Sequence, residues 1–264
     1  MSKLRFGFSP CPNDTFAFHA LVHGLVEVPF ELEPVLLDIE ELNRRARDGE
    51  LELTKLSFGA FAGVGDRYRL LRSGAALGFG CGPLVVAREA TSLAQAAAGP
   101  IAVPGLQTTA FLLLRRYAPA LGEVVELRYD RILRAIEKGD TEAGLIIHES
   151  RFTYTEHGLV RVCDLGELWE KETGLPVPLA GICARSDLDS ETRAAAEQAI
   201  RASVEYAFTH PAASVDYVRS NAQELSAEVC RAHIELYVNE SSIDLGETGI
   251  RAIESLLHAA PASD

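Results

Sequence analysis

The sequence has few cysteines, and none of them stands in a paired spacing. The five cysteines among its 264 residues are odd in number and scattered, at positions 11, 81, 163, 183 and 230. An odd number of cysteines without any CxxC or paired spacing disfavours a disulfide framework. We therefore expect free thiols in a reducing compartment.

Long hydrophobic runs are also missing. The longest nearly apolar stretch, residues 75–87, is interrupted by glycines and is too short to cross a bilayer. Residues 1–13 contain no apolar segment followed by a small-residue cleavage site. These absences predict a cytoplasmic protein with no membrane partner.

Basic residues are scarce. The sequence has 25 Lys and Arg against 38 Asp and Glu, a formal net charge of −13. A nucleic-acid surface needs clustered Lys and Arg to displace phosphate counterions, so we exclude nucleic acid as a partner. With 47% hydrophobic and 24% charged residues, the composition is that of an ordinary globular protein.

Several common catalytic motifs are absent. The sequence contains no GxSxG, no GxxxxGK[ST] and no GxGxxG after a strand, which disfavours serine hydrolysis and nucleotide cofactors. His19 and His23 have the i, i+4 spacing of metal ligands, but the HExxH context and a third ligand are missing. We therefore expect neither a nucleotide cofactor nor a zinc site.

The pattern along the chain is that of an α/β protein. Strand-like runs end in Gly, Pro, Ser or Asp and alternate with helical patterns, which favours βαβ units and parallel sheets. The expected strands are 4–9, 30–38, 53–58, 101–103, 124–129, 143–148, 159–164 and 176–185; the expected helices are 14–23, 39–47, 108–117, 132–138, 190–210 and 226–238.

The expected elements divide into two lobes with a cleft between them. The glycine-punctuated stretch 70–88 is predicted to be one bent strand or two strands that cross from one lobe to the other. Residues 1–85 plus 180–264 would form lobe one, and residues 86–179 lobe two. In helix 190–210, Ala196, Ile200, Val204 and Phe208 form an apolar stripe expected to pack on lobe one.

Four junctions between a strand and the next helix are unusually polar: 9–14, 55–57, 105–109 and 146–150. In open α/β sheets, ligands bind beyond the carboxyl ends of the strands, where helix N-termini attract anions. Asn13 and Asp14 are either ligand contacts or caps of the following helix. Thr108 and Thr109 could cradle a carboxylate, although capping alone would explain one of them.

His148 is the candidate base. Three aliphatic residues, Leu145 to Ile147, bring it to the end of a predicted buried strand. A histidine there suits proton transfer near neutral pH, but a structural histidine hydrogen-bonded in a loop is the alternative. Glu149 could orient it or face water. His233 lies on an apolar helical stripe, which favours a core position.

Four strings resemble the 1,4-dihydroxy-6-naphthoate synthases of the futalosine route to menaquinone. They are GFSPCPNDTF at 7–16, LTKLS at 53–57, the VPG and TTA segments at 103–105 and 108–110, and GLIIHESRFTY at 144–154. They occur in family order and span much of the chain. The first and last are highly specific.

The resemblance implies a two-lobed fold of the periplasmic-binding-protein type (type II) with the ligand in the cleft. It implies a cofactor-free and metal-free lyase that cleaves cyclic dehypoxanthinyl futalosine, a small carboxylate, to 1,4-dihydroxy-6-naphthoate and dihydroxyacetone. The family's proton acceptor falls on His148. Its substrate-binding segments fall on Lys55, Leu56, Ser57, Thr109 and Ala110. Thr108, which is adjacent, and Asn13 and Asp14, whose roles are less certain, are added as substrate-binding candidates.

Two alternatives remain open at this stage. One is chorismate dehydratase of the same pathway and fold, which the strings at 9–14 and 144–149 fit poorly. The other is a non-catalytic binding protein for a small carboxylate, since folds are shared between enzymes and receptors. The sequence does not indicate an oligomeric state.

Overall fold

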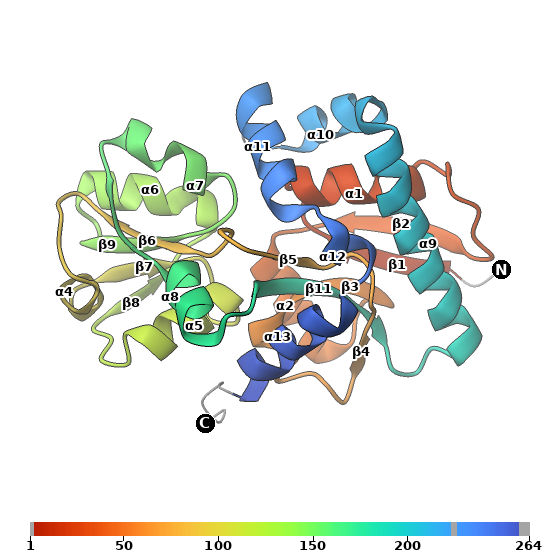
Figure 1. Cartoon of the computed structure of the whole chain (residues 1–264), viewed down its shortest axis with the longest axis horizontal. Coiled ribbons are helices and arrows are strands. Elements are labelled where there is room, and N and C mark those ends of the chain that lie inside the picture. The colour runs from red at the N-terminus through yellow and green to blue at the C-terminus, as the bar shows by residue number, and fades with distance from the viewer. Residues whose placement is uncertain (1–2, 223–225, 259–264) are drawn as a thin grey trace.

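The computed structural model, which describes residues 3–222 and 226–258, has two lobes side by side (Figure 1). The sheet of lobe one has the order β2-β1-β3-β11-β4, and β5 also pairs with β11. The sheet of lobe two has the order β10-β6-β9-β7-β8. The predicted two-lobed α/β class is confirmed.

The strands of lobe one are β1 (Lys3–Phe8), β2 (Glu31–Leu36), β3 (Leu53–Ser57), β4 (Tyr68–Leu70), β5 (Ala76–Gly78) and β11 (Val177–Arg185). Its helices are α1 (Pro12–Val22), α2 (Ile39–Asp48), α3 (Phe58–Phe61), α9 (Ser190–Thr209), η2 (Pro211–Ser214), α10 (Val215–Asn221), α11 (Ala227–Tyr237), α12 (Glu240–Ile243) and α13 (Gly246–His258). Strand β1 is parallel to β2 and β3, whereas β11 is antiparallel to β3 and β4.

The strands of lobe two are β6 (Leu84–Ala87), β7 (Ile101–Val103), β8 (Val124–Glu126), β9 (Ala143–Ile146) and β10 (Val160–Asp164). Its helices are α4 (Leu93–Ala98), α5 (Thr109–Tyr117), α6 (Tyr129–Lys138), α7 (Ser150–Thr153), η1 (Tyr154–His157) and α8 (Leu165–Thr173). Strand β7 is parallel to β8 and β9, and β6 runs antiparallel to β9 and β10.

The chain crosses between the two sheets twice. It leaves the first sheet after β5 and enters the second at β6; it returns between β10 and β11. Stretch 70–88 therefore holds the first crossing, and it contains two short strands, β5 and β6, which is one of the two forms predicted. The lobe limits at 85/86 and 179/180 fall inside β6 and β11, and that division stays a proposal.

Lobe one is built around an apolar cluster between its sheet and helices α1 and α9. The rings of Phe6, Phe8 and Phe18 pack with centroids 5.0 to 5.4 Å apart. On α9, Ala196, Ile200 and Val204 are buried against this cluster, as expected. Phe208 in the last turn is 43% exposed, so the predicted stripe ends one turn before the helix does.

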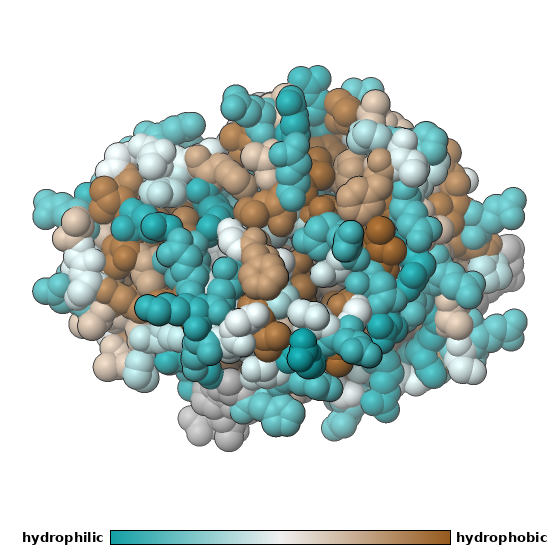
Figure 2. Space-filling view, viewed as in Figure 1, coloured by the Kyte–Doolittle hydropathy of each residue, from teal (hydrophilic) through white to brown (hydrophobic). Residues whose placement is uncertain are grey.

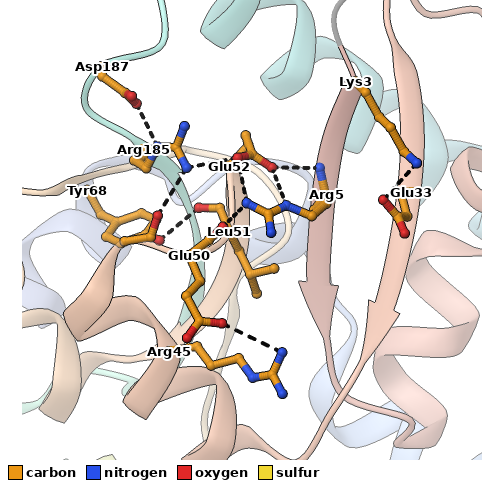
Figure 3. A network of polar contacts seen from close by, with 11 residues as sticks. Lys3, Arg5, Glu33, Arg45, Glu50, Leu51, Glu52, Tyr68, Arg185 and Asp187 are labelled. Carbon is orange, nitrogen blue, oxygen red and sulfur yellow. Dashed lines mark hydrogen bonds and ion pairs between the residues drawn. The ribbon is translucent and has the colours of Figure 1, made fainter.

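A polar network joins three neighbouring strands of lobe one: β1, the start of β3 and the end of β11 (Figure 3). Glu52 accepts hydrogen bonds from the backbone and guanidinium of Arg5 and from Arg185, all between 2.8 and 3.0 Å. Burial alone would raise the pKa of Glu52, but the hydrogen bonds and charge of Arg5, with the charge of Arg185, lower it to about 2. These bonds join residues far apart in the sequence, so their role is structural.

Large apolar side chains are exposed at six of the described positions: Leu25, Phe79, Leu106, Val160, Phe208 and Val215. Phe208 and Val215 line one groove, whereas the other four come from separate parts of the chain. Figure 2 shows hydrophilic residues spread over the face drawn, with apolar residues among them. Among the helices of the described residues, none has the length and apolar character needed to cross a membrane.

Candidate active site

A pocket lies between the lobes and gathers residues from all four polar junctions. It holds about 600 Å³ of space, including a part open to solvent. Seven of the predicted site residues line it: Asn13, Lys55, Ser57, Thr108, Thr109, Ala110 and His148. Leu56 is not among the lining residues; it packs on the other side of β3 with Ala46, Val64, Tyr68 and Cys183. Asp14 is not among them either, but it contacts a residue that is.

Asp14 forms a buried ion pair with Lys55. Its Oδ2 accepts hydrogen bonds from the backbone N–H and the hydroxyl of Ser9, at 3.0 and 2.7 Å, and its Oδ1 accepts one from Asn13 at 2.9 Å. The side chains of Asp14 and Lys55 are 3% and 5% exposed. This arrangement holds the Lys55 ammonium at the pocket wall with its charge balanced.

Neither Asn13 nor Asp14 caps the first helix, so that part of the prediction is wrong. Helix α1 begins at Pro12 with Cys11 as its N-cap and no side-chain cap. Because the helix starts earlier than expected, Asp14 lies in its first turn. From there its carboxylate reaches β1 and β3 instead of the helix's own amides.

Ser57 is held by Asn43 of α2. The amide of Asn43 donates to the Ser57 hydroxyl at 3.1 Å, and its carbonyl accepts from the Ser57 backbone N–H at 3.0 Å. Asn43 also donates to Glu40, which accepts from the backbone N–H of Gln107 across the cleft at 3.1 Å. Position 57 is thereby coupled to a contact between the lobes.

Helix α5 points its N-terminus at the pocket. Thr108 is its N-cap and accepts from the backbone N–H of Phe111 at 3.1 Å. The hydroxyl of Thr109 donates to the carbonyl of Leu179 at 2.6 Å and accepts from the N–H of Gly59 at 3.1 Å, so it bridges the two lobes. The first amides of a helix have no acceptor within the helix, which leaves those of Thr109 and Ala110 suited to an anion.

His148 lies two residues after the end of β9 and has an unusual backbone conformation. Its φ of 56° is the one positive φ at a non-glycine residue within the described part of the chain. Such conformations cost free energy and concentrate at functional sites. The ring packs edge-on against Tyr129 at 4.8 Å, and its Nε2 has no hydrogen-bond partner.

The environment keeps His148 neutral. Burial and, to a lesser extent, the positive charge of Lys55 lower its pKa to about 4, against the opposing effect of Asp14. An uncharged imidazole can accept a proton from a bound molecule. A bound anion would raise the pKa and favour that transfer.

Three further pocket residues were missed or misassigned from the sequence. Ser9 and Tyr237 line the pocket, and so does His233, which was assigned to the core. His233 is fully buried, as expected, but neither of its ring nitrogens has a hydrogen-bond partner. The apolar stripe on α11 gave no sign that a cavity lies over it.

The described residues contain no group of three or more His, Cys, Asp or Glu side chains placed to hold a metal ion. Cys11, another residue of the first junction, is buried and its pKa is raised well above the usual value, chiefly by burial. A thiol held in its neutral form is a poor nucleophile. The polar groups that line or border the pocket include His148, His233, the Asp14–Lys55 pair, the hydroxyls of Ser57 and Tyr237, and the first amides of α5.

The chain resembles proteins of known sequence and structure over nearly its whole length. It is 57% identical over 263 residues to the 1,4-dihydroxy-6-naphthoate synthase of Thermus thermophilus, covering 99% of this chain and 95% of that protein. It is 45% identical to the synthase of Streptomyces coelicolor, covering 98% and 93%.

Solved structures agree with the fold. A crystal structure of an Archaeoglobus fulgidus protein superimposes with a TM-score of 0.93 at 37% identity, covering 97% of this chain and 96% of that one. A Candida albicans protein with the generic periplasmic-binding-protein fold gives a TM-score of 0.72 at 16% identity, covering 100% and 92%. The family model described as menaquinone biosynthesis matches residues 4–262, and this chain belongs to that family.

Proposed function

We propose that this protein is a 1,4-dihydroxy-6-naphthoate synthase. As a carbon–carbon lyase, it would convert cyclic dehypoxanthinyl futalosine to 1,4-dihydroxy-6-naphthoate and dihydroxyacetone. The similarity to two synthases over nearly the whole chain supports the reaction. The observation that carries the mechanism is His148: a partly buried, strained and neutral imidazole whose buried Nε2 has no hydrogen-bond partner, at the pocket wall.

In the proposed mechanism, the substrate carboxylate lies against Ser57 and the first amides of α5. The hydroxyl of Thr109 is engaged by Leu179 and Gly59, so the backbone N–H of Thr109 is the group that contacts the anion. Lys55 adds positive charge nearby. His148 Nε2 then accepts the proton whose removal starts the cleavage, and the closed lobes fix the geometry and exclude water.

We place the reaction in the cytoplasm. All five cysteines are free thiols, and four of them are buried. Reduced cysteines of this kind fit a reducing compartment. Fractionation of the native host cell, followed by immunodetection, would test this location.

Turnover assays test the function and the base together. Purified protein incubated with cyclic dehypoxanthinyl futalosine, without added metal or nucleotide, should release 1,4-dihydroxy-6-naphthoate, detected by chromatography and mass. His148→Ala should lower kcat by at least 100-fold and still bind substrate. The exposed His258→Ala is the control and should match the wild type.

Each negative outcome has a separate meaning. A His148→Ala variant that retains most of its activity would remove His148 from the role of base. A well-folded wild type that gives no product would contradict the proposed reaction. Chorismate dehydration would then be assayed, and ligand binding without turnover of either compound would favour a binding protein.

A further inference from the structure

The second histidine of the pocket, His233, has no structural explanation within the protein. It lies on α11 with an exposure of 0%, and it lines the pocket. Neither Nδ1 nor Nε2 has a hydrogen-bond partner. A neutral imidazole carries one donor and one acceptor, and leaving both unsatisfied in a buried position opposes folding.

An apolar ring at this position would avoid that cost. The neighbours of His233 are aromatic: Tyr237 lies at 4.6 Å and Phe152 at 6.3 Å between ring centroids. Phenylalanine would fill a similar volume among them without an unsatisfied polar atom. Retaining a histidine is therefore explained best by a partner that arrives with the ligand.

The position of His233 limits what that partner can be. Its ring lies 6.2 Å from that of His148, with the planes 30° apart, so one small molecule can contact both. Burial, with the positive charge of Lys55, lowers the pKa of His233 well below 6.5. The ring is thus neutral, and it suits a hydroxyl, which also both donates and accepts, better than a carboxylate.

We propose that His233 is a substrate-contacting residue that hydrogen-bonds a hydroxyl or carbonyl oxygen of the hydroxylated, uncharged part of the substrate, next to the atom that His148 deprotonates. This inference rests on the proposed function and deepens it. The two histidines divide the work: His148 accepts the proton, and His233 orients the fragment that leaves. The carboxylate end lies separately, at Ser57 and α5.

The decisive variant is His233→Phe. It should fold and be at least as thermally stable as the wild type, because two unsatisfied nitrogens are removed. Its kcat/KM for cyclic dehypoxanthinyl futalosine should fall by at least tenfold. His233→Asn and His233→Gln, which restore a polar group near Nδ1 or Nε2, should recover part of the loss in at least one case. His19→Phe is the matched control, since His19 is a buried helical histidine outside the pocket lining, and it should leave kcat/KM unchanged.

A direct observation keeps the test independent of folding effects. In the inactive His148→Ala variant with isotope-labelled histidine, the ring-nitrogen resonances of His233 should shift when substrate is added. Unshifted resonances at saturation, or a His233→Phe variant with the kcat/KM of an active wild type, would overturn this inference alone. An inactive wild type would overturn the proposed function and this inference with it.

Discussion

Breaking the buried ion pair between Asp14 and Lys55 from one side should cause a large and measurable loss of stability. In Asp14→Asn, the ammonium of Lys55 loses its counter-charge in a site where both side chains are at most 5% exposed. Ser9 and Asn13 donate three hydrogen bonds to the carboxylate of Asp14. The side-chain NH₂ group of an asparagine at position 14 cannot accept a hydrogen bond, so at least one of these donors would lose its partner. Breaking a buried pair from one side costs about 3–5 kcal/mol. For a chain of this size, that should lower the Tm by roughly 10 °C.

Urea unfolding followed by circular dichroism measures this change over both lobes. Fluorescence of the single tryptophan, Trp169, follows lobe two, so it should respond less if the lobes unfold separately. Glu167→Gln is the control, because its pair with Arg161 is 58% and 47% exposed and should contribute less than about 1 kcal/mol.

The double variant Asp14→Asn/Lys55→Met completes the cycle. It removes the uncompensated charge, so it should be more stable than Asp14→Asn alone. A loss below about 1 kcal/mol in Asp14→Asn, or a double variant no more stable than the single one, would refute this account of the pair.

Three further predictions follow from the pocket and its surroundings. His148 must be neutral to act as a base and has a pKa of about 4, so kcat/KM should stay high as the pH falls to about 5 and decline near pH 4; a decline near pH 6.5 would contradict the environment described. The free energy of unfolding should also fall as the pH falls, because His148 takes up a proton near pH 6.5 in the unfolded chain but only near pH 4 in the folded one. Over this range the wild type should lose about 3 kcal/mol of stability. In urea titrations, His148→Phe should lose less. Gly82→Ala should destabilise by more than about 2 kcal/mol, because a Cβ at Gly82 would lie 2.3 Å from the backbone of Gly166, whereas Gly63→Ala, with its nearest atom at 3.6 Å, should change urea stability little.

The pocket could be found from the sequence because it follows from topology. Strands that end in polar junctions predicted where ligand-binding groups should lie, and residues from all four junctions line one pocket. Short apolar strands with clear turns, such as Ile101–Val103, were predicted with their observed limits. The resemblance added the proposed chemistry of His148, which the junction rule alone left open.

What the sequence did not reveal depends on contacts between distant segments. The capping role predicted for Asn13 or Asp14 was wrong because α1 begins at Pro12 with Cys11 as its N-cap, not at the preferred capping residues. His233 was assigned to the core because a helical stripe shows only which face is covered. The stripe does not show whether that face packs on another side chain or borders a cavity. This depends on lobe two, where His148 lies about 85 residues before His233 in the chain.

The crossing of the chain between sheets also sets the order in which the protein can be completed during translation. All strands of lobe two have been synthesised once the chain reaches residue 164. At that point lobe one still lacks β11, which pairs with β3, β4 and β5. Until β11 is synthesised, β3 presents one open edge of a strand whose five residues all become buried in the folded protein. The unpaired backbone N–H and C=O groups of an open strand edge invite pairing with other chains. The newly made N-terminal segment therefore needs protection for as long as lobe two takes to be synthesised.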